Sequence, residues 1–301
     1  MYQPKRISRN QFVAIRNLKY HVRVWGEPAP GRTPLVMVHG WMDVGASFQF
    51  IVDAFAQDHY VIAPDWRGYG LTESPPADNY WFPDYLADLD FLIDHYSPDA
   101  PVDLVGHSMG GNIVMLYAGS RPQRIRRLVN LEGFGMAATR PAQAPGRYAK
   151  WMDELKAFHR GDMALKSYDS LEGVSARLMK TNKRLAGNKA DWLAQHWAQR
   201  GADGQWRILG DAAHKIINAQ IFRVDEVLEL YKSIAAPTLV VEAADDSLSQ
   251  WWKGKYTLAE FHERLKSVPD LRRAAIADAG HMLHHDQPEA LAELIGNFLA
   301  T

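Results

Sequence analysis

Cysteine is absent from the 301-residue sequence. Its absence excludes disulfide bonds, catalysis by a thiolate and zinc sites with cysteine ligands. A chain without disulfides suits the reducing cytoplasm, which we expect as its location. Neither sign of charge dominates, with 34 Lys and Arg against 35 Asp and Glu. The composition therefore predicts no binding to nucleic acid or to an anionic membrane surface.

Long hydrophobic runs are also missing. No apolar stretch approaches the roughly 18 residues that suggest a membrane span, and residues 1–11 are polar and basic, unlike a secretory signal. We therefore expect no membrane span and no secretion by that route. Hydrophobic residues still make up 47% of the chain, enough for a full core. This length and content favour one domain with a sizeable insertion over two independent domains.

Short apolar runs alternate with helical patterns along most of the chain. Such runs are typical of strands buried on both faces of a parallel sheet, so we predict an α/β fold with a doubly wound sheet and helices on both faces. An antiparallel pair at 12–15 and 20–25 precedes it. The other expected strands are 34–38, 60–63, 102–105, 127–131, 238–242 and 272–276, and the expected helices include 46–57, 82–96 and one opening at Pro288.

Residues 135–211 break this rhythm, because they show helical, Trp-rich patterns without a convincing buried strand. We interpret them as an inserted helical cap on a core formed by residues 1–134 and 212–301. A cap there would cover the carboxyl edge of the sheet, where open α/β sheets bind their ligands.

The sequence Gly106-His107-Ser108-Met109-Gly110 directly follows one predicted strand and opens a predicted helix. A G-x-S-x-G motif in that context forms a nucleophile elbow, a tight strand-to-helix turn that presents the serine. Glycines flank the serine because neighbouring backbones must approach closely. Ser108 is therefore the predicted nucleophile.

A serine nucleophile needs a base within hydrogen-bond reach. His281 fits best, because it follows the last predicted strand and precedes the final helix, in the order serine, acid, histidine. His284 and His285 share its loop as surface or substrate-contacting alternatives. We interpret His39 and His107, beside motif glycines, as structural, although His107 is also a candidate for substrate binding.

Two carboxylates compete for the role of orienting the base. Asp246 follows the predicted strand 238–242 at the offset expected for the triad acid, and Asp245 is expected to face solvent or to cap a helix. Glu132 closes the strand 127–131 at the same sheet edge, where an unpaired carboxylate is costly. We favour Asp246 and keep Glu132 as the alternative acid.

An oxyanion hole requires two backbone N–H groups aimed at the developing negative charge. One should come from Met109, which follows the nucleophile, and the other from the loop after the first parallel strand, where Trp41 is the candidate. The Trp41 indole is also a candidate for substrate binding, and packing against the core is as good an interpretation. We expect no metal in this site.

These motifs together resemble those of the α/β-hydrolase superfamily, and its capped carboxylesterase and serine-hydrolase-like members above all. The resemblance rests on His39-Gly40-Trp41, Asp65 to Gly70, Gly106 to Gly110, the Asp246 region and Gly280-His281, in that order over essentially the whole chain. It implies a mostly parallel eight-stranded sheet, a cap after the sixth strand, no cofactor, and a structural role for Asp65 and Arg67.

Two departures narrow the resemblance. The loop 39–43 lacks the glycine run of many lipases, which disfavours a bulky triglyceride as substrate. Glu132 resembles the acid position of haloalkane dehalogenases, but these enzymes, like the epoxide hydrolases of the superfamily, need an aspartate nucleophile. Ser108 excludes both chemistries.

The predicted function is hydrolysis of a small or medium carboxylic ester, a small-molecule substrate, through an acyl-enzyme on Ser108. A lactonase, thioesterase, C–C hydrolase or cofactor-free perhydrolase would use nearly the same residues. A ligand-binding, receptor-like protein with a vestigial triad is the alternative from a different class.

Overall fold

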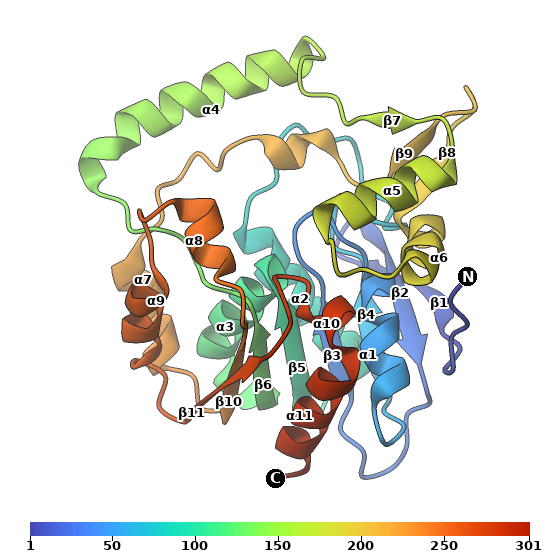
Figure 1. The fold of residues 1–301 in the computed structure, drawn as a ribbon. Helices are drawn as coiled ribbons and strands as arrows, with labels where there is room; N and C mark the ends of the chain where they lie inside the picture. The colour runs from blue at the N-terminus through green and yellow to red at the C-terminus, as the bar shows by residue number, and fades with distance from the viewer.

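The computed structural model describes residues 1–301 and contains one eight-stranded sheet with helices on both faces (Figure 1). The strand order is β1-β2-β4-β3-β5-β6-β10-β11. Strand β2 is antiparallel to β1 and β4, and all other neighbours are parallel, as predicted. The bounds are β1 Arg9–Ile15, β2 Leu18–Trp25, β3 Leu35–Val38, β4 Val61–Pro64, β5 Val102–His107, β6 Ile125–Leu131, β10 Thr238–Ala243 and β11 Leu271–Ile276.

Two hydrophobic clusters hold the helices against the two faces of this sheet. One cluster joins the sheet to α2, α3, α7 and α9, and the other joins it to α1 and α11. Strand β5 is buried along its whole length, as expected for a central strand of a parallel sheet. The helices of the core are α1 Gln49–Ala54, α2 Pro83–Tyr96, α3 Met109–Ser120, α7 Val224–Lys232, α8 Ser247–Trp252, α9 Leu258–Leu265, α10 Leu283–Asp286 and α11 Pro288–Ala300.

Residues 135–211 contribute no strand to the eight-stranded sheet. They form α4 Ala144–His159, α5 Leu171–Thr181 and α6 Gly187–Trp197, as the helical patterns predict. They also contain a second, three-stranded sheet of β7 Ser167–Tyr168, β9 Trp206–Ile208 and β8 Ala198–Arg200, which the sequence analysis missed. Strands of two or three residues are too short to show an alternating pattern.

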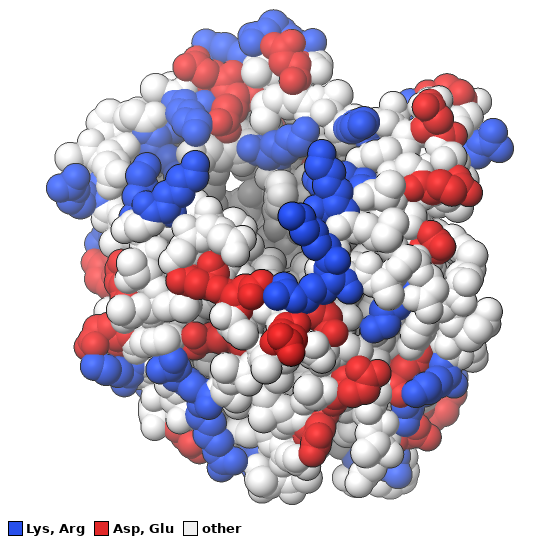
Figure 2. Space-filling model, in the orientation of Figure 1, with Lys and Arg blue, Asp and Glu red and all other residues white.

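The helices of this segment differ in how they contact the core. Helices α5 and α6 share a buried cluster with Val44, Ala46 and Phe50. Helix α4 has no buried residue and lies across the top of the molecule (Figure 1). Figure 2 shows a hollow beneath it, with Lys and Arg side chains along part of the rim. None of the helices has the length and apolar character required to cross a lipid bilayer.

Candidate active site

Ser108 lies in the turn between β5 and α3 with φ +54° and ψ −115°. This backbone conformation is rare for a residue with a side chain and is maintained by its surroundings. A Cβ atom at Gly106 would lie 2.3 Å from the Gly110 carbonyl oxygen, and one at Gly110 would lie 2.3 Å from the Val38 carbonyl oxygen. Gly106 is thus required for the tight turn, and Gly110 allows the end of β3 to pack closely against the start of α3.

His281 lies in the loop between β11 and α10. Its Nε2 atom is 2.9 Å from Ser108 Oγ, within hydrogen-bond distance. Burial lowers the pKa of His281, so the imidazole is unprotonated at neutral pH and able to accept a proton. The indole of Trp251 meets the imidazole edge to face, with ring centroids 4.2 Å apart.

Glu132 follows β6 and places its carboxylate on the other side of the imidazole. Its Oε2 atom is 3.3 Å from His281 Nδ1, and its Oε1 atom accepts a 2.7 Å hydrogen bond from the Ala243 N–H. The side chain is only 1% exposed. Burial raises the pKa of Glu132, while the hydrogen bond from Ala243 acts in the opposite direction. The structure thus brings Ser108, His281 and Glu132 into one hydrogen-bonded series.

Asp246, the favoured acid in the sequence analysis, does not reach His281. It is the N-cap of α8, where its Oδ1 atom accepts a 2.9 Å hydrogen bond from the Ser249 N–H and its Oδ2 atom pairs with the Ser249 hydroxyl. The contact with His281 expected of the favoured acid is therefore made by Glu132 and not by Asp246. Asp245 faces solvent, as one of its two interpretations expects, and forms an ion pair with Arg184 at 2.7 Å; it does not cap the helix. A helix start in Asp246-Ser247-Leu248-Ser249 is the local signal that indicates this outcome.

The remaining histidines of the motifs are buried. His107 is 2% exposed, and its Nε2 atom lies 2.7 Å from the His281 carbonyl oxygen. The ring therefore lies behind the nucleophile and does not form the contact with substrate for which it was a candidate. His284 and His285 are also buried, so neither is a surface residue. His39 accepts a 2.9 Å hydrogen bond from the Trp66 N–H, which agrees with its structural interpretation.

Of the two residues predicted to form an oxyanion hole, Met109 adjoins Ser108, and Trp41 lies in a loop that approaches it through Gly40. Met109 is the first residue of α3, and the first N–H groups of a helix have no acceptor within it. The loop that carries Trp41 passes close to the nucleophile, because a Cβ atom at Gly40 would lie 3.0 Å from Ser108 Cβ. The Trp41 side chain is 52% exposed, so it is not packed in the core.

Asp65 and Arg67, expected to be structural, lie outside this series. Asp65 accepts hydrogen bonds from His21 Nδ1 at 2.6 Å and from the Gly45 N–H at 2.7 Å. Arg67 forms a bidentate pair with Asp88, at 2.6 and 2.7 Å. Asp65 therefore connects the loop after β4 to β2, and Arg67 connects the same loop to α2.

A serine on a strand-to-helix elbow, hydrogen-bonded to a buried histidine at the carboxyl edge of a parallel sheet, is the arrangement of a serine hydrolase. The model of the alpha/beta hydrolase fold family matches residues 33–288. The chain belongs to the α/β-hydrolase family and is a hydrolase of the serine hydrolase or esterase type.

Individual relatives agree with this assignment. The chain is 26% identical to a serine hydrolase-like protein of Danio rerio over 282 residues, which cover 92% of this chain and 84% of the relative. It is 25% identical to the esterase YbfF of Escherichia coli, with 89% and 93% covered. The solved thioesterase domain from the curacin biosynthetic pathway is similar in fold, with a TM-score of 0.82, 24% identity, and 96% and 99% covered.

Proposed function

We propose that this protein hydrolyses small or medium carboxylic esters through an acyl-enzyme on Ser108, with His281 as general base and Glu132 as the triad acid. The observation that carries the proposal is the pair of contacts on one imidazole. Nε2 lies 2.9 Å from Ser108 Oγ, and Nδ1 lies 3.3 Å from Glu132 Oε2. A base held between a nucleophile and an orienting carboxylate is the arrangement that activates serine.

In the first half of the reaction, His281 Nε2 takes the Ser108 hydroxyl proton as Oγ attacks the ester carbonyl carbon. The carbonyl oxygen becomes an oxyanion, stabilised by the N–H groups of Met109 and Trp41. Loss of one such donor typically costs about 3 to 4 kcal/mol. The imidazolium then protonates the departing alcohol, and the acyl group remains on Ser108.

In the second half, water replaces the alcohol. His281 takes a proton from water as the water oxygen attacks the acyl carbon, and the second tetrahedral intermediate collapses to the free acid. The proton returns to Ser108 Oγ, so the enzyme is regenerated without a cofactor. Glu132 accepts a hydrogen bond from Nδ1–H throughout and stabilises the imidazolium without accepting its proton.

The surroundings of the nucleophile favour an apolar acyl or alcohol group. Trp41 and Trp251 are 52% and 51% exposed, and Trp251 contacts His281 directly. An exposed aromatic ring in contact with the catalytic base offers apolar surface that a substrate can bury. The names of the relatives, a serine hydrolase-like protein and an esterase, support the same substrate class.

The test combines covalent labelling with a substrate panel. A fluorophosphonate probe should label wild-type protein at Ser108 and leave Ser108→Ala unlabelled. Wild type should hydrolyse p-nitrophenyl esters of short to medium acyl length, and Ser108→Ala should lose at least about 10⁴-fold in kcat. Absence of labelling would refute the nucleophile and favour a binding protein. Labelling together with faster cleavage of thioester or lactone controls would refute the ester assignment.

A further inference from the structure

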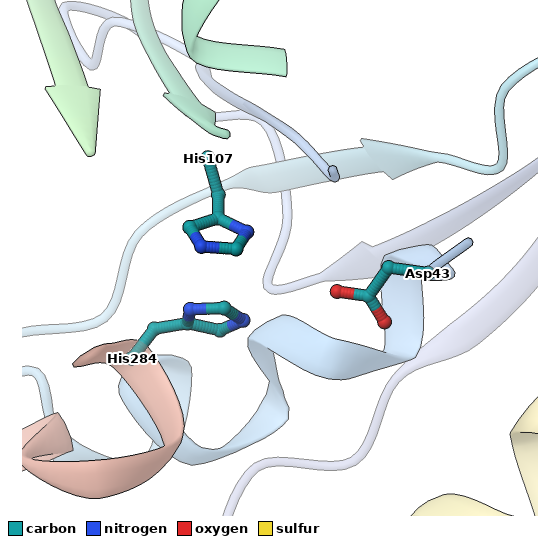
Figure 3. Close-up of side chains that lie close together, drawn as sticks. All are labelled: Asp43, His107 and His284. Atoms are coloured by element: carbon teal, nitrogen blue, oxygen red, sulfur yellow. The ribbon is translucent and has the colours of Figure 1, made fainter. Parts of the chain in front are cut away.

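Three buried side chains meet behind the nucleophile without serving the proposed triad. Asp43, His107 and His284 are 5%, 2% and 0% exposed, and one nitrogen or oxygen atom from each lies within 4.8 Å of those of the other two. Figure 3 shows the carboxylate of Asp43 directed toward the two imidazole rings. The residues come from the loop after β3, the end of β5 and α10, so the fold assembles them from distant parts of the chain.

The hydrogen bonding of this cluster is incomplete. Asp43 Oδ2, His107 Nδ1 and His284 Nδ1 are buried and have no partner. Buried polar atoms in proteins are nearly always paired, and each one left unpaired costs about 1 to 3 kcal/mol. Three such atoms on adjacent side chains indicate that the cluster has a further ligand.

The tautomer of His107 defines what that ligand must supply. His107 Nε2 lies 2.7 Å from the His281 carbonyl oxygen, which can only accept a hydrogen bond, so Nε2 carries the proton. With the proton on Nε2, Nδ1 of the neutral ring presents a lone pair. The free oxygen of Asp43 is an acceptor as well. Both atoms therefore require a hydrogen-bond donor or a cation, and neither has one in the structure.

Asp43 also lacks a counter-charge. Its Oδ1 atom accepts hydrogen bonds from the Val44 N–H at 2.9 Å and from Trp197 Nε1–H at 3.1 Å. The ionisable residue nearest to its carboxylate that could carry a positive charge is His39. His39 accepts the Trp66 N–H at Nε2 and contacts the Gly40 carbonyl through Nδ1, so it is neutral. A buried carboxylate without a cationic partner is unfavourable, and a bound cation supplies that partner.

We propose that Asp43, His107 and His284 form a binding site for one divalent transition-metal ion of the zinc class. Two imidazoles and one carboxylate are ligands that zinc accepts, with water completing the coordination. Zinc places its ligand atoms about 2.0 to 2.2 Å from the metal, so the three side chains must draw together on binding. A water molecule would satisfy the hydrogen bonds but leave the charge of Asp43 uncompensated.

The site is connected to the catalytic histidine. His107 contacts the His281 backbone through Nε2, and its ring lies 4.8 Å from the His281 ring. Movement of His107 toward a metal ion would therefore disturb His281. We expect Zn²⁺ to lower the rate of ester hydrolysis. This inhibition rests on the proposed function, whereas metal binding at the site is independent of it.

The test measures binding without reference to activity. Full-length protein is stripped with a chelator and titrated with Zn²⁺ by calorimetry, and the metal retained after gel filtration is counted. Wild type should bind about one equivalent. Asp43→Asn and His284→Gln should each weaken binding by at least about a hundredfold. Circular dichroism shows whether these variants fold, and the wild-type result stands even if they do not.

Matched variants show whether Zn²⁺ binds at Asp43, His107 and His284 or at other histidines of the protein. His285→Gln changes the adjacent buried histidine, and His262→Gln removes a histidine that pairs with Glu242 at 2.9 Å; both should bind Zn²⁺ like wild type. No binding by wild type, or equal binding by Asp43→Asn and wild type, would overturn the proposal. Loss of binding in His262→Gln or in a Ser108→Ala, His281→Gln double variant would place the ion elsewhere and overturn it too. If binding occurs without inhibition, only the link to His281 fails.

Discussion

Strands β6 and β10 are neighbours that both lead into an acidic residue at the same edge of the sheet, yet only one of these residues contacts the catalytic histidine. Glu132 follows β6 directly, with φ +56°, and is almost fully buried. Asp246 lies three residues beyond the end of β10, is exposed, and caps α8. A carboxylate whose oxygens both bond to the start of the next helix is not available to orient the base. The comparison shows that such local hydrogen bonds determine which of the two carboxylates contacts His281.

The strand pairing explains why Glu132 is the free one. The register of Leu131 with Val241 places Glu132 beside the end of β10, where the Ala243 N–H holds its Oε1 atom. Its second oxygen is left to face His281. Asp246, in contrast, uses both of its oxygens on Ser249.

Glu132→Gln should produce the largest effect at these two positions. The amide oxygen would accept the Ala243 N–H, so the NH₂ group would face His281 Nδ1 and force the proton onto Nε2. That tautomer cannot accept the Ser108 proton, and we expect kcat for p-nitrophenyl esters to fall roughly 10³- to 10⁴-fold. Asp246→Asn is the matched control. If Asp246→Asn is inactive and Glu132→Gln is active, Asp246 and not Glu132 is the triad acid.

Glu132→Asp should have an intermediate effect. The shorter side chain keeps the charge but moves the carboxylate away from Nδ1, and a misplacement of about 1 Å can cost about 10²-fold. We expect kcat to fall tenfold to a hundredfold, with unchanged KM. A loss as large as that of Glu132→Gln would show that position matters as much as charge.

The elbow and the acid differ in how far the sequence can predict them. The elbow is largely local, because β5, Ser108 and α3 follow one another and Gly106 is needed within the turn, although Gly110 is needed for the approach of β3. The choice of acid is not local, because it depends on the pairing of β6 with β10 across more than a hundred residues. The N-cap pattern at Asp246 is the one local signal, and it does not identify Glu132 as the residue that contacts His281. The buried Asp43 cluster likewise joins segments that only the fold brings together.

The helix α8, which follows β10, contributes an aromatic residue instead of the acid, and Trp251→Ala should show its effect. Trp251 in α8 holds an edge-to-face contact with His281, and such pairs contribute about 0.5 to 1.5 kcal/mol. We expect kcat/KM to fall by up to about tenfold. Trp251→Phe keeps an aromatic edge and should restore most of the loss. A Trp251→Ala variant with wild-type kinetics would show that the ring does not support the base.

Asp246→Ala should have the smallest effect on turnover and a measurable effect on stability. The substitution removes the N-cap of α8, which typically costs about 0.5 to 2 kcal/mol, so urea denaturation should show a lower midpoint. Because Asp246 does not contact His281, we expect kcat/KM to fall less than about threefold, through loosening of α8 and its Trp251. Asp246→Asn preserves capping ability and should recover both properties. If Asp246→Ala instead loses activity as Glu132→Gln does, with stability unchanged, Asp246 orients the base during turnover. The contacts of Glu132 would then be structural.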